Sequence, residues 1–243
     1  MSCAASAARP DEVELWAVRL DLTPTALARA RELLDVAERE RVARLIGPRQ
    51  RARAIASGAA LRRVLAGYLA LSPEELALER APGLRPRLRG EEGLAFNLTH
   101  SGDVAAVAVT QRAAVGIDVE MLGRRTRARV VCRALAPQEL VAVRRRAPAR
   151  REEAFLRHWT AKEAFVKARG GLAGEELAAV VVQDAYADAR LAGRSGWSLR
   201  RYDPAPGVVG AVVAAGGPWR ARRRYEADLS GAVRRAGRRG SAR

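Results

Sequence analysis

The chain has 243 residues, of which 49% are hydrophobic, so it can bury a substantial core in one domain or in two small ones. Its net charge of +17, from 44 basic and 27 acidic residues, favours polyanionic partners: nucleic acid, an acidic protein face or a phosphorylated small molecule. The two cysteines exclude a disulfide framework, and no apolar run is long enough to span a membrane. The first residues, MSCAASAARPDEVEL, lack the layout of a signal peptide, so we expect a cytoplasmic protein without a membrane partner.

The first part of the chain reads as a strand, helices and then further strands. Residues 13–20 alternate as in a strand, and helical patterns follow at 25–46 and 49–71. The sequence Ser72-Pro73-Glu74-Glu75 predicts the start of a short helix. Short alternating runs broken by glycines predict strands from 76 to 121.

The second part reads as helices followed by strands. Helical patterns cover residues 127–134, 137–146 and 151–169, and the runs AAVVVQD, WSLRRYD, GVVGAVVAA and WRARRRY read as strands. The order predicts an α+β fold of two similarly built halves that meet near residues 105–115. The predicted parts are a flexible N-terminus (1–12), an N-terminal half (13–108), a C-terminal half (109–219) and a basic, partly disordered tail (220–243).

Two acids on one predicted strand suggest a metal site. In Val115-Gly116-Ile117-Asp118-Val119-Glu120 the side chains alternate, so Asp118 and Glu120 project together while the valines and the isoleucine point into the core. Neighbouring carboxylates repel each other unless a cation lies between them, and oxygen ligands of this kind suit magnesium. Taken alone, such a pair is more often a solvated strand edge.

A predicted helix adds a third acid. In FLRHWTAKEAFVK, Trp159, Glu163 and Lys167 fall on one helical face. Glu163 would complete a magnesium site with the pair on the strand, and Lys162 and Lys167 would neutralise phosphate oxygens. These are the two lysines of a chain that otherwise uses arginine, which indicates a need for a compact ammonium here. Chance under a biased composition is the alternative.

A third motif, Phe96-Asn97-Leu98-Thr99-His100-Ser101-Gly102, offers hydroxyl groups, an imidazole and backbone N–H groups at the end of a strand. Such a strand end can hold a phosphate. An ordinary turn with a surface histidine is the simpler explanation of this motif by itself.

Taken in this order, FNLTHS, VGIDVE and FxxxWTAKEAFVKARGG resemble the signature segments of 4′-phosphopantetheinyl transferases of the two-domain, surfactin-synthetase-activating type. The resemblance covers roughly residues 13–215. It implies a monomer of two pseudo-symmetric α+β halves that binds coenzyme A as co-substrate in the cleft between them. The expected activity is transfer of 4′-phosphopantetheine from coenzyme A to a serine of an acyl or peptidyl carrier protein domain, with release of 3′,5′-ADP.

The resemblance also implies roles for the motif residues. Asp118, Glu120 and Glu163 would bind Mg²⁺, or alternatively Mn²⁺, and Glu163 is a candidate base for the carrier serine. Phosphate contacts would come from Lys162 and Lys167, and coenzyme A phosphates would also be contacted by Thr99 and His100. We count Asp118, Glu120, Glu163, Lys167 and His100 as the catalytic set.

The nucleotide end of coenzyme A would be held by arginines. Arg53 matches the family's arginine for the 3′-phosphate, Arg41 an auxiliary cation, and Arg85-Pro86 the basic residue–proline pair. Three features depart from the family pattern. Leu84 intervenes before Arg85, the segment KARGGL is one residue short, and Glu38 stands where a second basic residue is expected.

Carrier proteins commonly present an acidic helix beside the modified serine, and a basic surface would attract it. A docking contact from 120–150 is one possibility, and a core role for that segment is the other. Two other functions fit parts of the sequence. An arginine-rich nucleic-acid-binding protein fits the composition, although only nonspecific binding by the tail is expected. A magnesium-dependent phosphohydrolase fits the acids.

Overall fold

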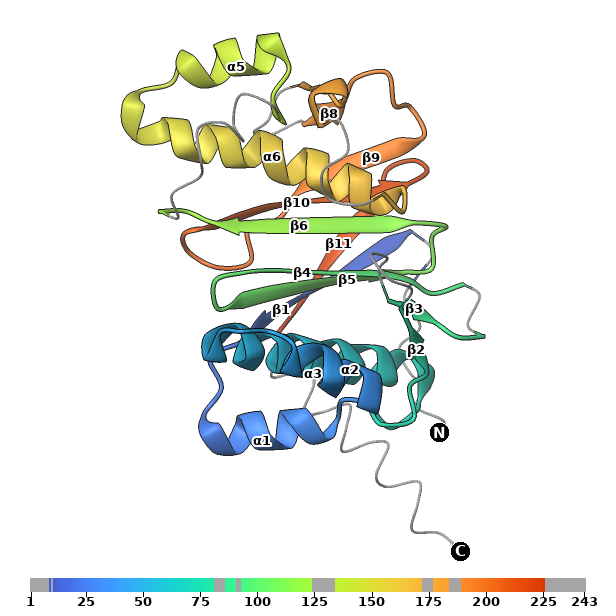
Figure 1. Cartoon of the computed structure of the whole chain (residues 1–243). Helices are drawn as coiled ribbons and strands as arrows, with labels where there is room; N and C mark the ends of the chain where they lie inside the picture. Colours follow the sequence, from blue (N-terminus) through green and yellow to red (C-terminus); the bar gives the residue numbers. More distant parts are fainter. Residues whose placement is uncertain are drawn as a thin grey trace, which may run out of the picture.

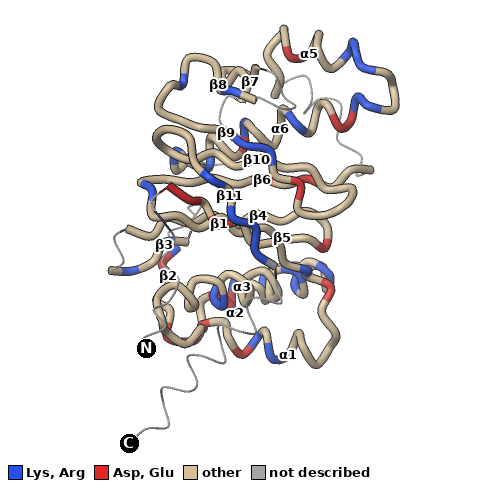
Figure 2. Tube along the Cα trace, turned by 180° about the vertical axis from the view of Figure 1, so that it is seen from behind, with Lys and Arg blue, Asp and Glu red and all other residues tan. Residues whose placement is uncertain are grey.

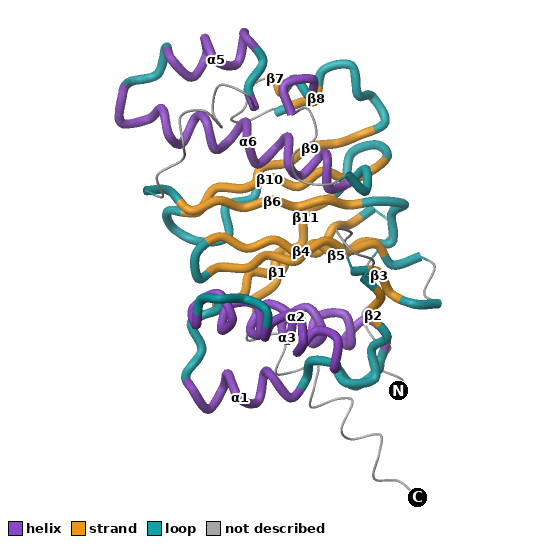
Figure 3. Tube along the Cα trace, in the orientation of Figure 1, coloured by secondary structure: helices purple, strands orange, loops and turns teal. Residues whose placement is uncertain are grey.

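The structure, a computed structural model, describes residue 9 and residues 11–80, 86–90, 93–123, 134–171, 177–183 and 189–225. Helices form the two outer layers and strands lie between them (Figures 1 and 3). Helices α1, α2 and α3 cover one sheet and α6 covers the other, so the predicted α+β fold of two halves is confirmed. No helix within these described ranges is long and apolar enough to cross a membrane.

Three helices make up the outer layer of the N-terminal half. These helices are α1 (Pro24–Glu32), α2 (Val36–Ala43) and α3 (Pro48–Leu69). The sequence predicts one helix over 25–46, but Asp35 interrupts it. The Asp35 side chain accepts a hydrogen bond from the Glu38 backbone N–H, and the Glu38 carboxylate accepts one from the Asp35 N–H. This capping box begins a new helix.

The strands of the N-terminal half are β1 (Glu12–Arg19), β2 (Leu78–Glu79), β3 (Arg87–Leu88), β4 (Ala95–Ser101) and β5 (Val104–Thr110). The short helix predicted at Ser72 is wrong, because the segment forms a turn. The Glu75 N–H donates to the Ser72 carbonyl at 3.1 Å, and the Glu75 carboxylate accepts from the Ser72 N–H at 2.8 Å. The capping contacts are therefore present without a helix to follow them.

In the C-terminal half one long helix lies across a small sheet. The elements are β6 (Val115–Met121), α5 (Pro137–Arg144), the 3₁₀ turn η1 (Pro148–Arg150), α6 (Arg151–Ala168), the 3₁₀ turn η2 (Leu177–Ala179), β7 (Val182–Gln183), β8 (Arg190–Leu191), β9 (Trp197–Arg201), β10 (Val208–Ala215) and β11 (Arg220–Tyr225). The helices predicted at 137–146 and 151–169 are confirmed as α5 and α6. The helix predicted at 127–134 lies almost wholly outside the described residues.

The two main sheets have the strand orders β11-β1-β5-β4 and β6-β10-β9. Between them lies a core of buried apolar side chains from both sheets, including Leu15, Ala106, Ile117, Val212 and Trp219. The alternation of each strand sends its other face to the helices; Trp16 and Val107, for example, pack against α3. One hydrophobic core thus joins the halves.

The last described strand, predicted from the run WRARRRY, joins the sheet of the N-terminal half. β11 pairs in parallel with β1, so the sheet of the N-terminal half contains residues from the end of the described chain. The buried carboxylate of Glu14 accepts a hydrogen bond from Arg224 at 2.7 Å, and the Arg224 guanidinium also lies over the Trp16 ring. Residues 220–225 are therefore an ordered strand, and the disorder predicted for 226–243 falls on residues that are not described.

A glycine sets the distance between α6 and β6. A Cβ atom on Gly116 would lie 2.0 Å from the Ala164 carbonyl oxygen and 2.4 Å from the Ala168 nitrogen. Both atoms belong to the backbone of α6, so neither can move away as a flexible side chain could. Any side chain at this position of β6 would push the helix away from the strand.

We therefore predict that Gly116→Ala destabilises the protein by about 1–3 kcal/mol through overpacking. The measurement is the free energy of unfolding in urea. Gly196→Ala is the matched control, since a Cβ atom there meets nothing within 4 Å. Equal stability of the two variants would contradict the close packing of α6 on β6.

Candidate functional site

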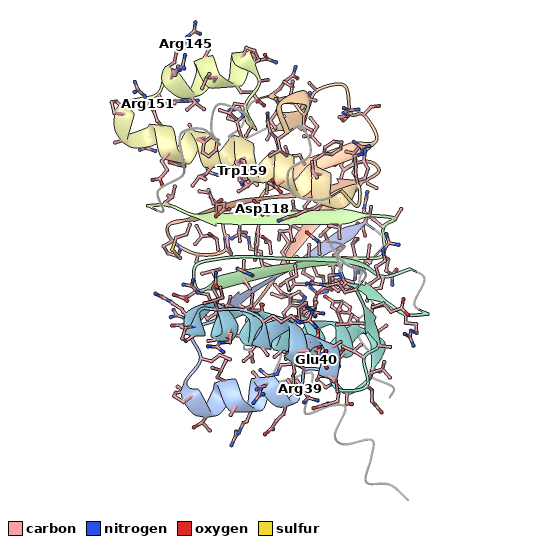
Figure 4. All side chains as sticks on the ribbon, in the orientation of Figure 1. Arg39, Glu40, Asp118, Arg145, Arg151 and Trp159 are labelled. Carbon is pink, nitrogen blue, oxygen red and sulfur yellow. The ribbon has the colours of Figure 1, made fainter. Side chains whose placement is uncertain are left out.

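The two acids of β6 project from one face of the strand, as predicted. Val115, Ile117 and Val119 are buried in the core between the sheets, whereas Asp118 and Glu120 lie on the alternate face. Figure 4 marks Asp118 on β6 and Trp159 on α6, the helix that packs along this strand. Asp118 is only 4% exposed and Glu120 is half-buried, so Asp118 is not part of a solvated strand edge.

Asp118 is held by side chains from both halves. The Lys167 ammonium, on α6, donates to the Asp118 Oδ1 atom at 2.5 Å and to the Ile117 carbonyl at 3.3 Å. The Thr99 hydroxyl, on β4, donates to the same Oδ1 atom at 3.0 Å and accepts from Lys167 at 3.3 Å. Lys167 and Thr99, both predicted to contact phosphate, therefore meet beside Asp118.

Glu163 is the third acid, and α6 places it near the other two. It is buried, with 4% of its surface exposed. Burial raises the pKa of Glu163 to about 7, the negative charges of Asp118 and Glu120 add to the increase, and Lys167 opposes it. Three carboxylates thus share a region where one lysine supplies positive charge.

The chemistry of this group suits a hard divalent cation. Asp118 Oδ2 is buried without a hydrogen-bond partner, and the pKa of Glu163 is raised by burial first and by neighbouring negative charge second. Carboxylate oxygens are the ligands that Mg²⁺ takes. Among the residues that the structure describes, no three acidic, histidine or cysteine side chains are gathered closely enough to hold an ion as they stand. The metal-binding role of the three acids stays a prediction.

Two further residues of β4 form hydrogen bonds with β6. Neither was selected as a site residue from the sequence. The Asn97 side-chain oxygen accepts from the Ile117 backbone N–H at 2.9 Å. The Ser101 hydroxyl donates to Glu120 at 2.6 Å and accepts from the Met121 N–H at 3.0 Å. We call the side chains of Asn97, Thr99 and Ser101, together with their partners on β6, the β4–β6 seam. The signal was available, since alternate residues of FNLTHS share one face of a strand.

Lys162 does not lie at this site. Its side chain is fully buried, forms an ion pair with the Glu139 carboxylate and donates to the Ala134 carbonyl at 2.8 Å. Neighbouring residues on a helix point in different directions, so Lys162 faces α5 while Glu163 faces β6. In this structure the ammonium of Lys162 holds α5 against α6 and has no free path to a phosphate, which departs from the prediction.

A cavity of about 400 Å³ lies in the N-terminal half, and several predicted nucleotide-binding residues line it. Its lining includes Arg41, Pro86 and His100. Arg80, which sequence reasoning did not select, lines it as well. Partial desolvation lowers the pKa of Arg80 and the positive charge of Arg41 lowers it further, whereas the negative charge of Glu38 opposes the change, so the two guanidinium groups repel each other and Glu38 offsets part of that repulsion. An anion between them would relieve that repulsion.

Other predicted contacts are placed differently. Arg53 does not line this cavity; it donates to Asp103 at 2.8 Å, and Arg49 donates to the same carboxylate at 2.7 Å. Thr99 and His100 are neighbours on β4, and they contact different regions: Thr99 joins the seam and His100 lines the cavity. Arg85 and the Leu84 departure lie outside the described residues. Glu38, the third departure, binds the buried Arg62 at 2.7 Å.

Comparison with known proteins agrees with this division into halves. Residues 21–112 match the family model described as 4′-phosphopantetheinyl transferase, N-terminal, and residues 114–199 match that of the 4′-phosphopantetheinyl transferase superfamily. The boundary between the matches falls between β5 and β6, the strands that end one half and begin the other.

Individual relatives carry the same description. The chain is 33% identical over 214 residues to the 4′-phosphopantetheinyl transferase HetI of Nostoc sp., a match that covers 86% of this chain and 90% of that protein. It is 39% identical over 93 residues to 4′-phosphopantetheinyl transferase AcpT of Escherichia coli K12, covering 37% and 46%. A match to the L-aminoadipate-semialdehyde dehydrogenase-phosphopantetheinyl transferase of Eremothecium gossypii is 31% identical over 162 residues and covers 60% and 55%. This chain therefore belongs to the 4′-phosphopantetheinyl transferases of the two-domain type.

Proposed function

We propose that this chain transfers 4′-phosphopantetheine from coenzyme A to a serine of acyl or peptidyl carrier protein domains and releases 3′,5′-ADP. One observation carries the proposal: Asp118 and Glu163 are buried acids from a strand and a helix, and their charge exceeds what Lys167 neutralises. Such a group favours a cation with a phosphate attached to it. The family membership supports the same assignment.

The acids would hold a divalent cation, Mg²⁺ in the first instance, with Mn²⁺ as a substitute. Asp118, Glu120 and Glu163 are its proposed ligands. When bound, the cation would neutralise charge on the diphosphate of coenzyme A. The Lys167 ammonium already donates to Asp118, and another of its three N–H groups would donate to a phosphate oxygen.

The transfer step requires positioning and one proton acceptor. The serine oxygen forms a bond to the β-phosphorus, the bond from that phosphorus to the bridging oxygen breaks, and 3′,5′-ADP leaves with that oxygen. Glu163, or a water that it orients, would take the serine proton. Its raised pKa supports this role, because a carboxylate with a higher proton affinity is a better base. Lys167 would stabilise negative charge on the leaving diphosphate oxygen.

The cavity in the N-terminal half is the proposed place for the nucleotide end. Arg41 and Arg80 lie in its lining and repel each other, Glu38 offsets only part of that repulsion, and a phosphate of coenzyme A would offset more of it. His100 in the same lining offers a further donor. The 3′-phosphate would thus depend on Arg41 and Arg80. Arg53, which lies on α3, is instead paired with Asp103.

The carrier protein would approach a positively charged molecule. Figure 2 shows lysine and arginine in both halves of the molecule, with a run of arginines along β11. A net charge of +17 would attract the acidic face of a carrier domain and raise the association rate at low salt. We propose that the protein acts as a monomer.

We predict that Glu163→Gln and Asp118→Ala each lower the transfer rate by a factor of about 10²–10⁴, because each removes a metal ligand or proton acceptor. The measurement incubates protein, coenzyme A, Mg²⁺ and several apo-carriers, and follows the phosphopantetheine mass gain by mass spectrometry. Glu153→Gln, near the start of the same helix and paired with Arg157, is the control.

Near wild-type rates in both variants would contradict the assignment of Asp118 and Glu163 to the active site. Phosphopantetheine released without a carrier would indicate the phosphohydrolase instead. Tight, salt-steep binding of duplex DNA that survives removal of 220–243 would revive the nucleic-acid alternative.

We predict that Arg80→Ala raises the KM for coenzyme A about tenfold, since a hydrogen bond to a charged group is lost. With 3′-dephospho-coenzyme A as substrate, the difference between wild type and variant should largely disappear. Arg39→Ala is the control: Arg39 lies on α2 like Arg41, is exposed, and does not line the cavity (Figure 4). An equal effect of Arg80→Ala on both substrates would place the 3′-phosphate elsewhere.

The metal-free protein should lose stability as the pH rises. The pKa of Glu163 is raised from 4.5 to about 7 on folding, so the folded state binds this proton more tightly than the unfolded state. The resulting stabilisation is complete below pH 4.5 and is lost as the pH rises through about 7. The total is on the order of 3 kcal/mol.

Urea unfolding at pH 5 and pH 8 in EDTA measures this loss, and Glu163→Gln should flatten it. Added Mg²⁺ should restore stability at pH 8 in the wild type. A wild-type protein equally stable at both pH values would contradict the burial of an ionisable Glu163.

A further inference from the structure

We propose that Ser101 is a positioning residue for Glu120 and that it acts across the boundary between the two halves. The proposal rests on the proposed function, in which Glu120 is a metal ligand. Ser101 itself touches neither coenzyme A nor the carrier in this account. Its role would be to fix where the Glu120 carboxylate lies before any ligand binds.

The two hydrogen bonds of Ser101 fix the direction in which its hydroxyl group donates its proton. The Met121 backbone N–H donates to Ser101 Oγ at 3.0 Å, and Ser101 Oγ donates to Glu120 Oε2 at 2.6 Å. A hydroxyl has one proton to donate, and here that proton is directed at the carboxylate. Ser101 is 3% exposed, so water does not compete strongly for these bonds. A short bond to an ionised acceptor in such surroundings is strong.

The turn that follows β4 keeps Ser101 in place. Gly102 has a positive φ of 59°, and a Cβ atom there would lie 2.4 Å from the Met121 side chain. The chain therefore turns tightly against Met121, the residue whose N–H binds Ser101 Oγ. Glycine at 102 allows both the turn and the contact.

Side chains connect β4 to β6. The two strands belong to different sheets and share no backbone ladder within the described ranges. Asn97, Thr99 and Ser101 each contact β6, and they are alternate residues of β4. Asn97 fixes the backbone at Ile117, Thr99 binds Asp118, and Ser101 binds Glu120. The N-terminal half thereby sets the position of both acids that the C-terminal half supplies.

Glu120 has a longer side chain than Asp118 and is less buried, so its carboxylate has more positions available to it. A glutamate side chain has several rotamers, and one hydrogen bond at its carboxylate selects among them. Groups that orient a metal ligand in this way typically change metal affinity by about 10–100-fold when removed.

The test measures Mn²⁺ binding to the full chain by electron paramagnetic resonance, with coenzyme A present. Ser101→Ala should weaken Mn²⁺ binding about tenfold, while Ser101→Thr, which keeps the hydroxyl, should bind like the wild type. Ser198→Ala on β9 is the matched control, because it removes a hydroxyl that donates to the Gly216 carbonyl at 3.0 Å. The Mg²⁺ concentration for half-maximal transfer should rise in Ser101→Ala, with the rate recovering in excess Mg²⁺.

A double-mutant cycle separates positioning from general loss of structure. In the Glu120→Gln background, Ser101→Ala should add little further loss of Mn²⁺ affinity. If Ser101→Ala does not fold, Ser101→Cys fills the same space with a weak donor and takes its place in the cycle.

Three results would overturn the proposal: additive effects in the cycle, wild-type Mn²⁺ affinity in Ser101→Ala, or no Mn²⁺ binding by the wild type. Failure of the proposed function looks different, because the wild type would then bind Mn²⁺ with the same Ser101–Glu120 coupling but modify no carrier.

Discussion

The close approach of α6 to β6 is the constraint on which the site depends. Gly116 lets the helix backbone come within contact of the strand, and this proximity brings Glu163 and Lys167 to Asp118. A helix displaced by one side chain would carry Glu163 and Lys167 away from Asp118. Glycine at 116 is thus a chemical requirement of the site as much as a packing detail.

That packing has an electrostatic cost, which the seam reduces. Burying carboxylates is unfavourable unless charges and donors compensate them. Lys167 and Thr99 satisfy one oxygen of Asp118, and Ser101 satisfies one oxygen of Glu120. The other oxygen of Asp118 is buried without a partner, and Glu163 has its pKa raised. The donors and Lys167 therefore compensate the carboxylates only in part. A divalent cation would neutralise the negative charge that remains.

The sequence allowed correct predictions where they depend only on the residue periodicity of one strand or one helix. The alternation of a strand predicted that Asp118 and Glu120 share a face, and the helical period placed Glu163 with Lys167. Lys162 could not be placed in this way, because its partner Glu139 comes from a different helix. The parallel pairing of β11 with β1 also depends on contacts between distant parts of the chain, which no local pattern records.

The arrangement of two halves also explains why neither half could carry the proposed chemistry by itself. The acids and Lys167 come from the C-terminal half, whereas their orienting hydroxyls come from β4 and the arginine-lined cavity lies in the N-terminal half. Since β4 and β6 are joined by side chains and not by a backbone ladder, their relative position is set by Asn97, Thr99 and Ser101 and by the apolar core between the sheets. β11 adds a covalent connection between the halves, because the chain passes from β10 in the second sheet to β11 in the sheet of the first half. A shift of one half against the other would therefore have to break the seam or pull β11 from β1, and this resistance keeps the acids and the cavity at a fixed separation.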